Sequence, residues 1–211
     1  MTDVTDPAPG PIERSGSRRT SRPSVDTTTR VAAGSTLLRV EDLHTSFDMP
    51  FGEVKAVNGV SFALRHGRTL GIVGESGSGK TVLVRSIMRL NLGSTVTTTG
   101  TVEFNGRELL GIPIRQMQDL WGPELAMVFQ DPMTSLNPLV RVSRQVTEHL
   151  HRHLGVNRDQ ARQTALELMR EVQIPEPEAR LRAFPHELSG GMRQRVCIAI
   201  ALACEPTLLF A

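Results

Sequence analysis

GESGSGKT spans Gly74 to Thr81, and this stretch decides how the rest of the chain is interpreted. It matches G-x-x-x-x-G-K-[ST] at every fixed position, which is the pattern of a loop that cradles phosphates. Glycines let a backbone wrap closely around a polyphosphate, and a helix that starts after the loop adds the positive end of its dipole. We expect the Lys80 ammonium to reach the β- and γ-phosphates and the Thr81 hydroxyl to bind Mg²⁺.

The surroundings of the loop support a nucleotide site. The apolar run Thr69–Val73 precedes it as a predicted buried strand, and residues 81–90 follow it with helical spacing. The alternative is a glycine- and serine-rich turn that binds nothing, but the complete motif in this context favours the nucleotide. Lys80 is one of two lysines in the chain, the other being Lys55. The residues expected to contact the nucleotide are Gly74, Glu75, Ser76, Gly77, Ser78, Gly79, Lys80 and Thr81.

The remaining patterns predict an α/β protein. Residues 141–183 are predicted to be helical, with Ser143 and Asn157 as N-caps, and a further helix is predicted from Ser189 to about Ala203. The last run, Thr207–Ala211, is apolar throughout, which is typical of a strand inside a sheet. Other predicted strands are residues 37–43, 56–64 and 125–129, and a hairpin at 101–109 with an Asn105-Gly106 turn.

Composition narrows the class of protein. A chain of 211 residues with 39% hydrophobic residues can build a core, and a net charge of +2 argues against a dedicated nucleic-acid binder. The two cysteines, Cys197 and Cys204, indicate no disulfide framework. The longest apolar run, Val196–Ala203, is about half of a membrane span. Residues 1–35 are rich in Ser, Thr, Pro, Asp and Arg, so we expect a disordered extension before a soluble, cytosolic domain.

A second glycine pair lies in LSGGMRQR, Leu188 to Arg195. Ser189 as an N-cap with Gly190 and Gly191 in a tight turn would explain it without any ligand. However, both glycine-rich stretches are predicted helix starts, which are natural anion sites. One nucleotide hardly needs two such sites so far apart in one chain, whereas two facing chains would use both.

With these motifs, residues 37–211 resemble the nucleotide-binding subunits of ATP-binding-cassette (ABC) transporters. The phosphate loop corresponds to the Walker A motif, Leu188–Met192 to the signature, and FQDPMTSLNP, Phe129 to Pro138, to the Q-loop. The sequences of PHELSGGMRQR and of the Q-loop resemble those of the oligopeptide/dipeptide (and nickel) importer subgroup. The resemblance implies an α/β P-loop NTPase fold with a RecA-like core, an antiparallel β subdomain and a helical subdomain at about residues 132–187, spread over a partial domain at 36–211.

The resemblance also implies roles for single residues. Lys80 and Gln130 would act in catalysis, and Thr81 and Gln130 would hold Mg²⁺, although Gln130 could instead satisfy backbone groups at a strand end. An aromatic residue would stack on the adenine of ATP; Phe47 or Phe51 is the candidate, and packing in a hairpin is the alternative for both. The partner subunit's ATP would be contacted by Ser189, Gly190 and Gly191.

By the same resemblance, the partners would be a second ABC ATPase subunit, two membrane permease subunits and, indirectly, an extracytoplasmic solute-binding protein. The chain would be located at the cytoplasmic face of the membrane, and no nucleic-acid partner is expected. Thr207–Ala211 matches the Walker B strand, and the sequence stops before the acids that follow it in the family. We therefore expect a C-terminally incomplete ATPase that hydrolyses ATP poorly. The alternatives are a non-catalytic ATP-binding or assembly module, and a soluble ABC ATPase of DNA repair or translation.

Overall fold

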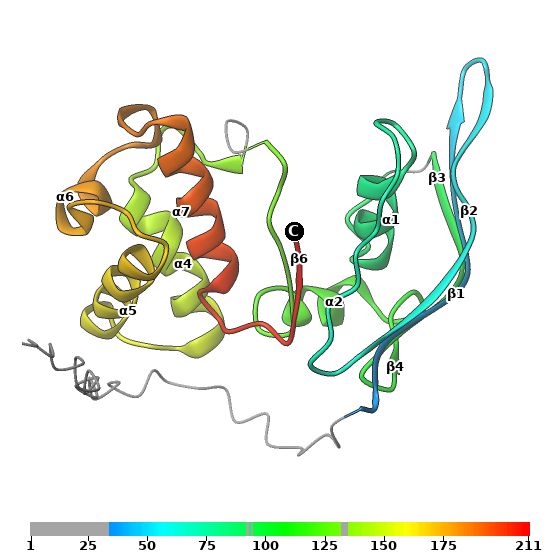
Figure 1. Cartoon of the computed structure of the whole chain (residues 1–211), viewed down its shortest axis with the longest axis horizontal. Helices are drawn as coiled ribbons and strands as arrows, with labels where there is room; N and C mark the ends of the chain where they lie inside the picture. Colours follow the sequence, from blue (N-terminus) through cyan, green and yellow to red (C-terminus); the bar gives the residue numbers. More distant parts are fainter. Residues whose placement is uncertain (1–33, 92, 94, 132–134) are drawn as a thin grey trace, which may run out of the picture.

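The computed structural model describes residues 34–91, 93, 95–131 and 135–211. Figure 1 shows two regions, an antiparallel sheet with α1 against it and a group of helices across the molecule from it. Each region has its own apolar core. Within those residue ranges, no helix is both long enough and apolar enough to cross a membrane.

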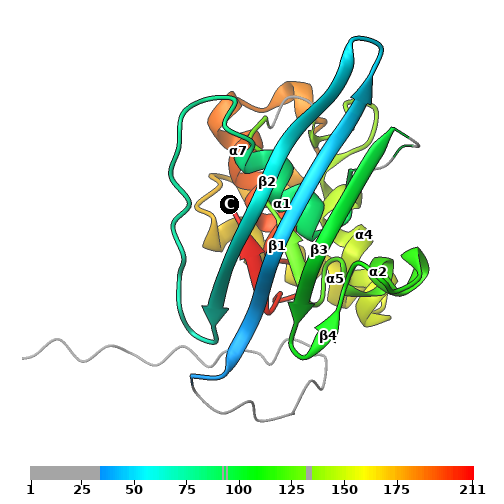
Figure 2. The same cartoon turned by 90° about the vertical axis from the view of Figure 1, so that its right-hand side faces the viewer.

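The sheet region is built on long antiparallel strands. β1 (Thr36–Met49) lies between β2 (Gly52–Arg65) and β3 (Val96–Phe104), and the short β4 (Arg107–Glu108) completes the order β2-β1-β3-β4 (Figure 2). The turn between β3 and β4 is the predicted Asn105-Gly106 pair, with φ of 51° and 80°. Positive φ at both positions is what a two-residue type I′ hairpin needs, so this prediction is confirmed.

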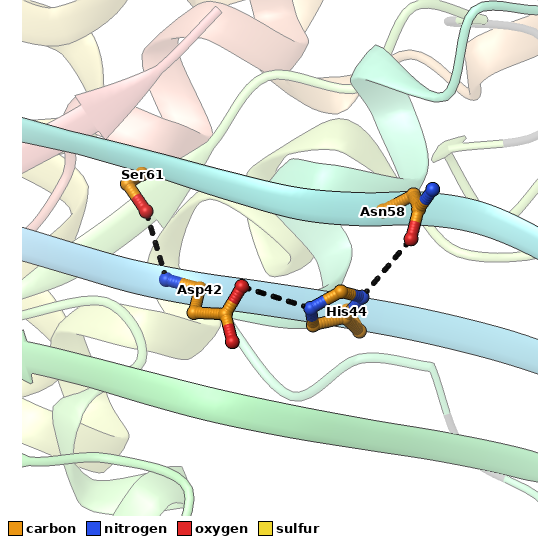
Figure 3. Close-up of polar contacts among 4 residues, drawn as sticks. All are labelled: Asp42, His44, Asn58 and Ser61. Atoms are coloured by element: carbon orange, nitrogen blue, oxygen red, sulfur yellow. Dashed lines mark hydrogen bonds and ion pairs between the residues drawn. The ribbon is translucent and has the colours of Figure 1, made fainter.

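Polar side chains hold a bulge in β1, where the register with β2 shifts between residues 40 and 43. Asp42 has φ of 48°, and its N–H donates to Ser61 Oγ at 2.9 Å. The His44 imidazole lies between two oxygens, with Nε2 2.9 Å from Asp42 Oδ1 and Nδ1 3.2 Å from Asn58 Oδ1 (Figure 3). Ser61 contacts the backbone and not the imidazole, so this cluster shapes the strand and does not form a catalytic triad.

Helix α1 (Lys80–Ile87) packs on the sheet through a buried polar contact. Ser86 Oγ on α1 lies 2.7 Å from the Thr45 hydroxyl on β1, and both residues are buried. Leu83 and Ile87 fill the core beside them. Because buried hydroxyls are stable when they find partners, this contact favours one position of α1 relative to β1.

β5 (Leu125–Met127), which follows α2 (Ile114–Leu120) in the chain, pairs with β6 (Leu208–Phe210) near the C-terminus in a separate, parallel two-stranded sheet. Both strands were predicted, but they are shorter than the apolar runs that contain them. Phe129, predicted to be in a buried strand, is 47% exposed beyond the end of β5. Among the described residues, β6 pairs with β5 alone.

The predicted strand at Thr69–Val73 does not form. Residues 68–75 have no regular secondary structure, and Leu70, Ile72 and Val73 are 43%, 43% and 96% exposed. An apolar run becomes a strand when a neighbouring strand completes its hydrogen bonds. None of the strands described here pairs with these residues, which explains the difference.

The second region consists of helices packed on one another. α4 (Val142–Leu154), α5 (Arg158–Glu171) and α7 (Gly190–Leu202) surround a common core, closed by α6 (Pro177–Arg182) and the 3₁₀ turn η1 (Pro185–Glu187). The helical character predicted for 141–183 and for 189–203 is confirmed. The boundaries expected for a helical subdomain stay a prediction, and residues 1–33 of the expected extension lie outside the described residues.

Two of the three predicted helix caps are correct. Asn157 accepts from Gln160 N at 2.9 Å in a full capping box, and Ser189 accepts from Met192 N at 3.3 Å. Ser143 is not a cap, because α4 begins one residue before it, at Val142. The Val142 N–H donates to the carbonyl of Ala183 at 3.0 Å, so a tertiary contact satisfies the amide that a cap would otherwise serve.

Candidate functional site

The phosphate loop leads directly into α1. Its residues Gly74 to Ser78 are exposed, and the Ser78 N–H donates to the Glu75 carbonyl at 3.2 Å in a tight turn. Gly79 precedes the helix with φ of 86°, and no side chain caps its first turn. The first N–H groups of α1 therefore face outward with the positive end of the helix dipole, which is the geometry of an anion site.

Gly79 is required by its surroundings. A Cβ at this position would lie 2.2 Å from the carbonyl oxygen of Ala56 on β2, and its φ is one that side-chain-bearing residues rarely adopt. The loop is thus pressed against the sheet at one point. This contact fixes the start of α1 close to the backbone of β2.

Lys80 is held by acceptors of its own loop. Its Nζ donates to the carbonyls of Gly74 at 2.7 Å and Glu75 at 2.6 Å, and to Ser78 Oγ at 3.2 Å. The Thr81 hydroxyl next to it is exposed and has no hydrogen-bond partner among the residues described. An ammonium and a free hydroxyl at a helix start fit a phosphate with its divalent cation.

Gln130 follows the carboxyl end of β5 and is exposed. The pairing of β5 with β6 continues one residue beyond the strand, since Val128 N donates to the carbonyl of Phe210 at 2.8 Å. Figure 1 shows the chain running on from β5 toward the upper edge of the molecule, beside the C-terminus. The carboxyl ends of parallel strands are where α/β proteins bind ligands, so the position suits the predicted role.

The signature glycines have a different setting from those of the phosphate loop. Gly190 and Gly191 begin α7, are exposed, and do not have positive φ. A Cβ on either would meet no atom within 4 Å. Figure 1 places the starts of α1 and α7 on opposite sides of β6, both toward the top of the view. Among the described residues, no packing contact requires glycine at either position, which leaves room for a ligand or another chain to approach.

The two candidate aromatic residues also differ. Phe47 on β1 is half-buried and lies two residues from Thr45, which contacts α1, so both side chains are on the same face of the strand. Phe51 lies at the turn between β1 and β2 and is 96% exposed. Sequence reasoning left this choice open, because it depends on which face of β1 meets α1.

A cavity of about 280 Å³ lies at the joint between the two regions. Trp121 and Met88 line it from the sheet side, and His149 and Cys197 from the helical side. Trp121 Nε1 donates to the carbonyl of Met88 at 3.0 Å, which orients the indole beside this cavity. Burial lowers the pKa of His149, with the nearby Arg152 acting in the same direction and Glu148 against it. Sequence reasoning did not single out His149, whose stacked neighbour is His153 at 6.0 Å between ring centroids.

Solved structures with the same fold are ABC cassettes. A dimeric structure of a post-hydrolysis state of the ATP-binding cassette MJ0796 bound to ADP and Pi is 24% identical, with a TM-score of 0.73 over 82% of this chain and 72% of that one. A second MJ0796 dimer, described as a bacterial ABC transporter cassette, gives a TM-score of 0.72 over the same shares. These matches show the fold, an ABC nucleotide-binding P-loop domain.

Curated relatives are more similar in sequence. The oligopeptide transport ATP-binding protein OppD of Bacillus subtilis is 49% identical over 83% of this chain and 49% of its own length. The dipeptide transport ATP-binding protein DppD of Lactococcus lactis is 47% identical over 83% of this chain and 50% of its own length. The chain thus spans about half the length of the curated relatives it matches. The family model for ABC transporters matches residues 57–211. This chain therefore belongs to the ABC transporter family.

Proposed function

We propose that this chain is part of an ATP-binding subunit that powers the import of peptides or similar small solutes. The observation that carries the proposal is the open start of α1, where Lys80, Thr81 and free N–H groups converge beside a glycine that the sheet contact requires. Relatives that are 45–51% identical and carry peptide-transport names support the solute class.

Lys80 neutralises phosphate charge in this proposal. Binding of a polyphosphate exchanges its contacts to the Gly74 and Glu75 carbonyls for contacts to charged oxygens, which are stronger acceptors. The Thr81 hydroxyl and the Gln130 amide oxygen are the groups that would hold Mg²⁺. When bound, Mg²⁺ supplies charge stabilisation between the β- and γ-phosphates. Gln130 would also orient the attacking water.

We further propose that Phe47, rather than Phe51, packs against the adenine. Its face of β1 is the one that meets α1, whereas Phe51 is exposed at the hairpin tip. Replacing Phe47 with Ala should weaken ATP binding more than the same change at Phe51, measured by calorimetry. Equal effects would contradict this assignment.

The start of α7 is proposed to contact ATP held by a second subunit. The support is the open space around Gly190 and Gly191 and the separation of α7 from α1 within one chain. Ser189 presents its hydroxyl beside the same helix start. The three residues therefore form an anion site that can contact the phosphates of an ATP held by the phosphate loop of a facing subunit. Binding of MgATP should therefore promote association of two subunits, detected by light scattering.

The transport role is testable with a chimera, because the chain matches half of its relatives. Residues 36–211 would replace the matching segment of Bacillus subtilis OppD in cells that lack OppD. We expect oligopeptide uptake to return, and the same chimera with Lys80→Ala to remain inactive. A chimera that binds ATP but never supports uptake would favour a non-catalytic assembly module. Partnership with permeases at the inner face of the membrane is part of the same proposal.

A further inference from the structure

A large cavity lies away from the phosphate loop, in the helical region. It is a groove of about 1000 Å³ between α4, α5 and α6. In Figure 1 these helices lie on the opposite side of the molecule from the sheet. The groove is therefore not part of the ATP site described above.

Arginines dominate its walls. Five of them line it, from all three helices: Arg144, Arg152, Arg158, Arg162 and Arg182. Each is exposed, and no side-chain hydrogen bond or ion pair of theirs is found within the described part of the chain. Two carboxylates also line the groove, and the one on Glu178 is already paired with Arg170 outside the groove's lining. The groove thus has a strong excess of positive charge.

The order of the helices sets where these charges gather. α4 and α5 are joined by the short turn at residues 155–157, so Arg152, near the end of α4, and Arg158, at the start of α5, lie at the same end of the groove. Arg162 follows one helical turn later on the same face of α5. Arg144 and Arg182 lie at the other end, where the start of α4 meets the end of α6.

Helix stability does not explain Arg158. A cation in the first turn of a helix opposes the helix dipole, and Arg158 is the first residue of α5. Repulsion from Arg162 at i, i+4 adds to this. A residue that is unfavourable for its own helix and has no ion pair with any described residue is well suited to an anionic ligand.

The floor of the groove is apolar, formed by the buried Ala165 and Leu181 and the half-buried Leu166. None of the lining residues is Phe, Tyr or Trp, so there is no flat apolar ring to recognise a nucleobase. Guanidinium groups match phosphate oxygens in pairs of parallel hydrogen bonds. These features select phosphate groups as the chemistry that would be recognised.

We propose that this groove, the arginine groove, is a second anion site that binds phosphate groups through Arg152, Arg158 and Arg162. The phosphates come either from a free polyphosphate solute or from the headgroups of anionic lipid. The proposal is independent of the proposed transport role, because it concerns a cavity in a different region of the fold.

The test starts from the chain with Lys80→Ala, so that the phosphate loop does not contribute. Sodium tripolyphosphate is titrated into it by calorimetry at low salt, where exposed charges are least screened. We expect binding that Arg158→Gln/Arg162→Gln weakens roughly tenfold or more, as expected for lost charge-assisted hydrogen bonds. The matched control is Arg68→Gln/Arg107→Gln, which removes the same charge from exposed arginines elsewhere and should change little.

An increase in affinity for tripolyphosphate provides a second readout, because a variant that merely misfolds would lose affinity. Glu148→Gln removes a carboxylate from the lining of the groove and should tighten tripolyphosphate binding several-fold. Thermal unfolding checks that all variants remain folded. No detectable binding, or an equal loss in the control variant, would overturn the proposal.

Vesicles distinguish the two phosphate sources. Binding to phosphatidylglycerol vesicles but not to phosphatidylcholine vesicles, lost with Arg158→Gln/Arg162→Gln, identifies lipid headgroups. Binding of tripolyphosphate without vesicle binding identifies a free solute. Preference for a polyglutamate peptide over tripolyphosphate would instead show that the groove takes an acidic protein segment and would overturn the phosphate assignment.

Discussion

The starts of α1 and α7 look alike in sequence but differ in what requires their glycines. At α1, Gly79 has positive φ and faces the Ala56 carbonyl at a distance that excludes a side chain. At α7, Gly190 and Gly191 have ordinary backbone angles and open space around them. Contacts inside the chain thus shape the first glycine-rich stretch, whereas no described residue restricts the two glycines of the second. The difference teaches that steric contacts inside the fold can require glycine at one helix start and not at another that looks similar in sequence.

The largest expected effect comes from breaking the α1 side of this comparison. Gly79→Ala places a methyl group against the Ala56 carbonyl and strains φ, so it should lower the free energy of unfolding by about 2–4 kcal/mol. Urea denaturation measures this. Gly77→Ala is the control, because Gly77 has positive φ but no atom within 4 Å of its Cβ position, so only the strain of about 1–2 kcal/mol remains. Equal losses would show that the close contact is unimportant.

Lys80→Ala tests the ligand side of the same loop. Removing a charged donor that can bond phosphate oxygens should weaken MgATP binding by about 1.5–3 kcal/mol, at least tenfold, with little change in the stability of the free protein. Isothermal calorimetry gives the affinity. Lys55→Ala is the matched control, since Lys55 is exposed on β2 and is the remaining lysine. If both variants lose the same affinity, the loop is not the binding site.

Alanine substitutions at the start of α7 should not lower the free energy of unfolding, in contrast to Gly79→Ala at the start of α1. Gly190→Ala and Gly191→Ala introduce a better helix former without a clash, so each should leave the free energy of unfolding unchanged or raise it by up to about 1 kcal/mol. The same changes should weaken ATP-dependent association of two subunits. Destabilisation comparable to that of Gly79→Ala would remove the contrast between the two helix starts.

The smallest expected effect concerns the joint that connects the two regions. Burial lowers the pKa of His149 in the folded state below its usual 6.5, so the unfolded state binds the proton more readily. The contribution of His149 to the free energy of unfolding is therefore fully present above about pH 6.5, and it is lost as the pH falls below that value. His149→Gln should flatten this slope in urea denaturation between pH 7 and 5. An unchanged slope would assign the pH dependence to other groups, such as the less buried His153.

The elements that sequence reasoning predicted correctly are those with local causes. Asn157 and Ser189 cap their helices through side chains that reach three residues ahead, and Asn105-Gly106 turns a hairpin through its own dihedrals. Thr69–Val73 was predicted as a strand and is not one, because a strand needs a partner that the apolar pattern does not reveal. Ser143 failed as a cap for a similar reason, since a distant carbonyl satisfies the start of α4.

The features of the candidate site also fall into those that local sequence predicts and those that depend on the fold. The phosphate loop, Gln130 and the signature are contiguous motifs, and each could be located without knowledge of the fold. The choice between Phe47 and Phe51 depends on knowing which face of β1 meets α1. The need for glycine at position 79 is visible only from its close contact with β2. The arginine groove was invisible in sequence, because its arginines are spread over residues 144 to 182 and meet through helix packing.

The sequence by itself determined the phosphate loop, the signature and the family to which the chain belongs, because each depends on neighbouring residues whose backbone and side-chain chemistry act together. Tertiary structure alone decided which glycines are sterically required, which aromatic side chain lies on the face of β1 that meets α1, and where the arginines of the groove converge. These depend on distances between residues remote in the chain, and such distances arise only when the strands and helices pack.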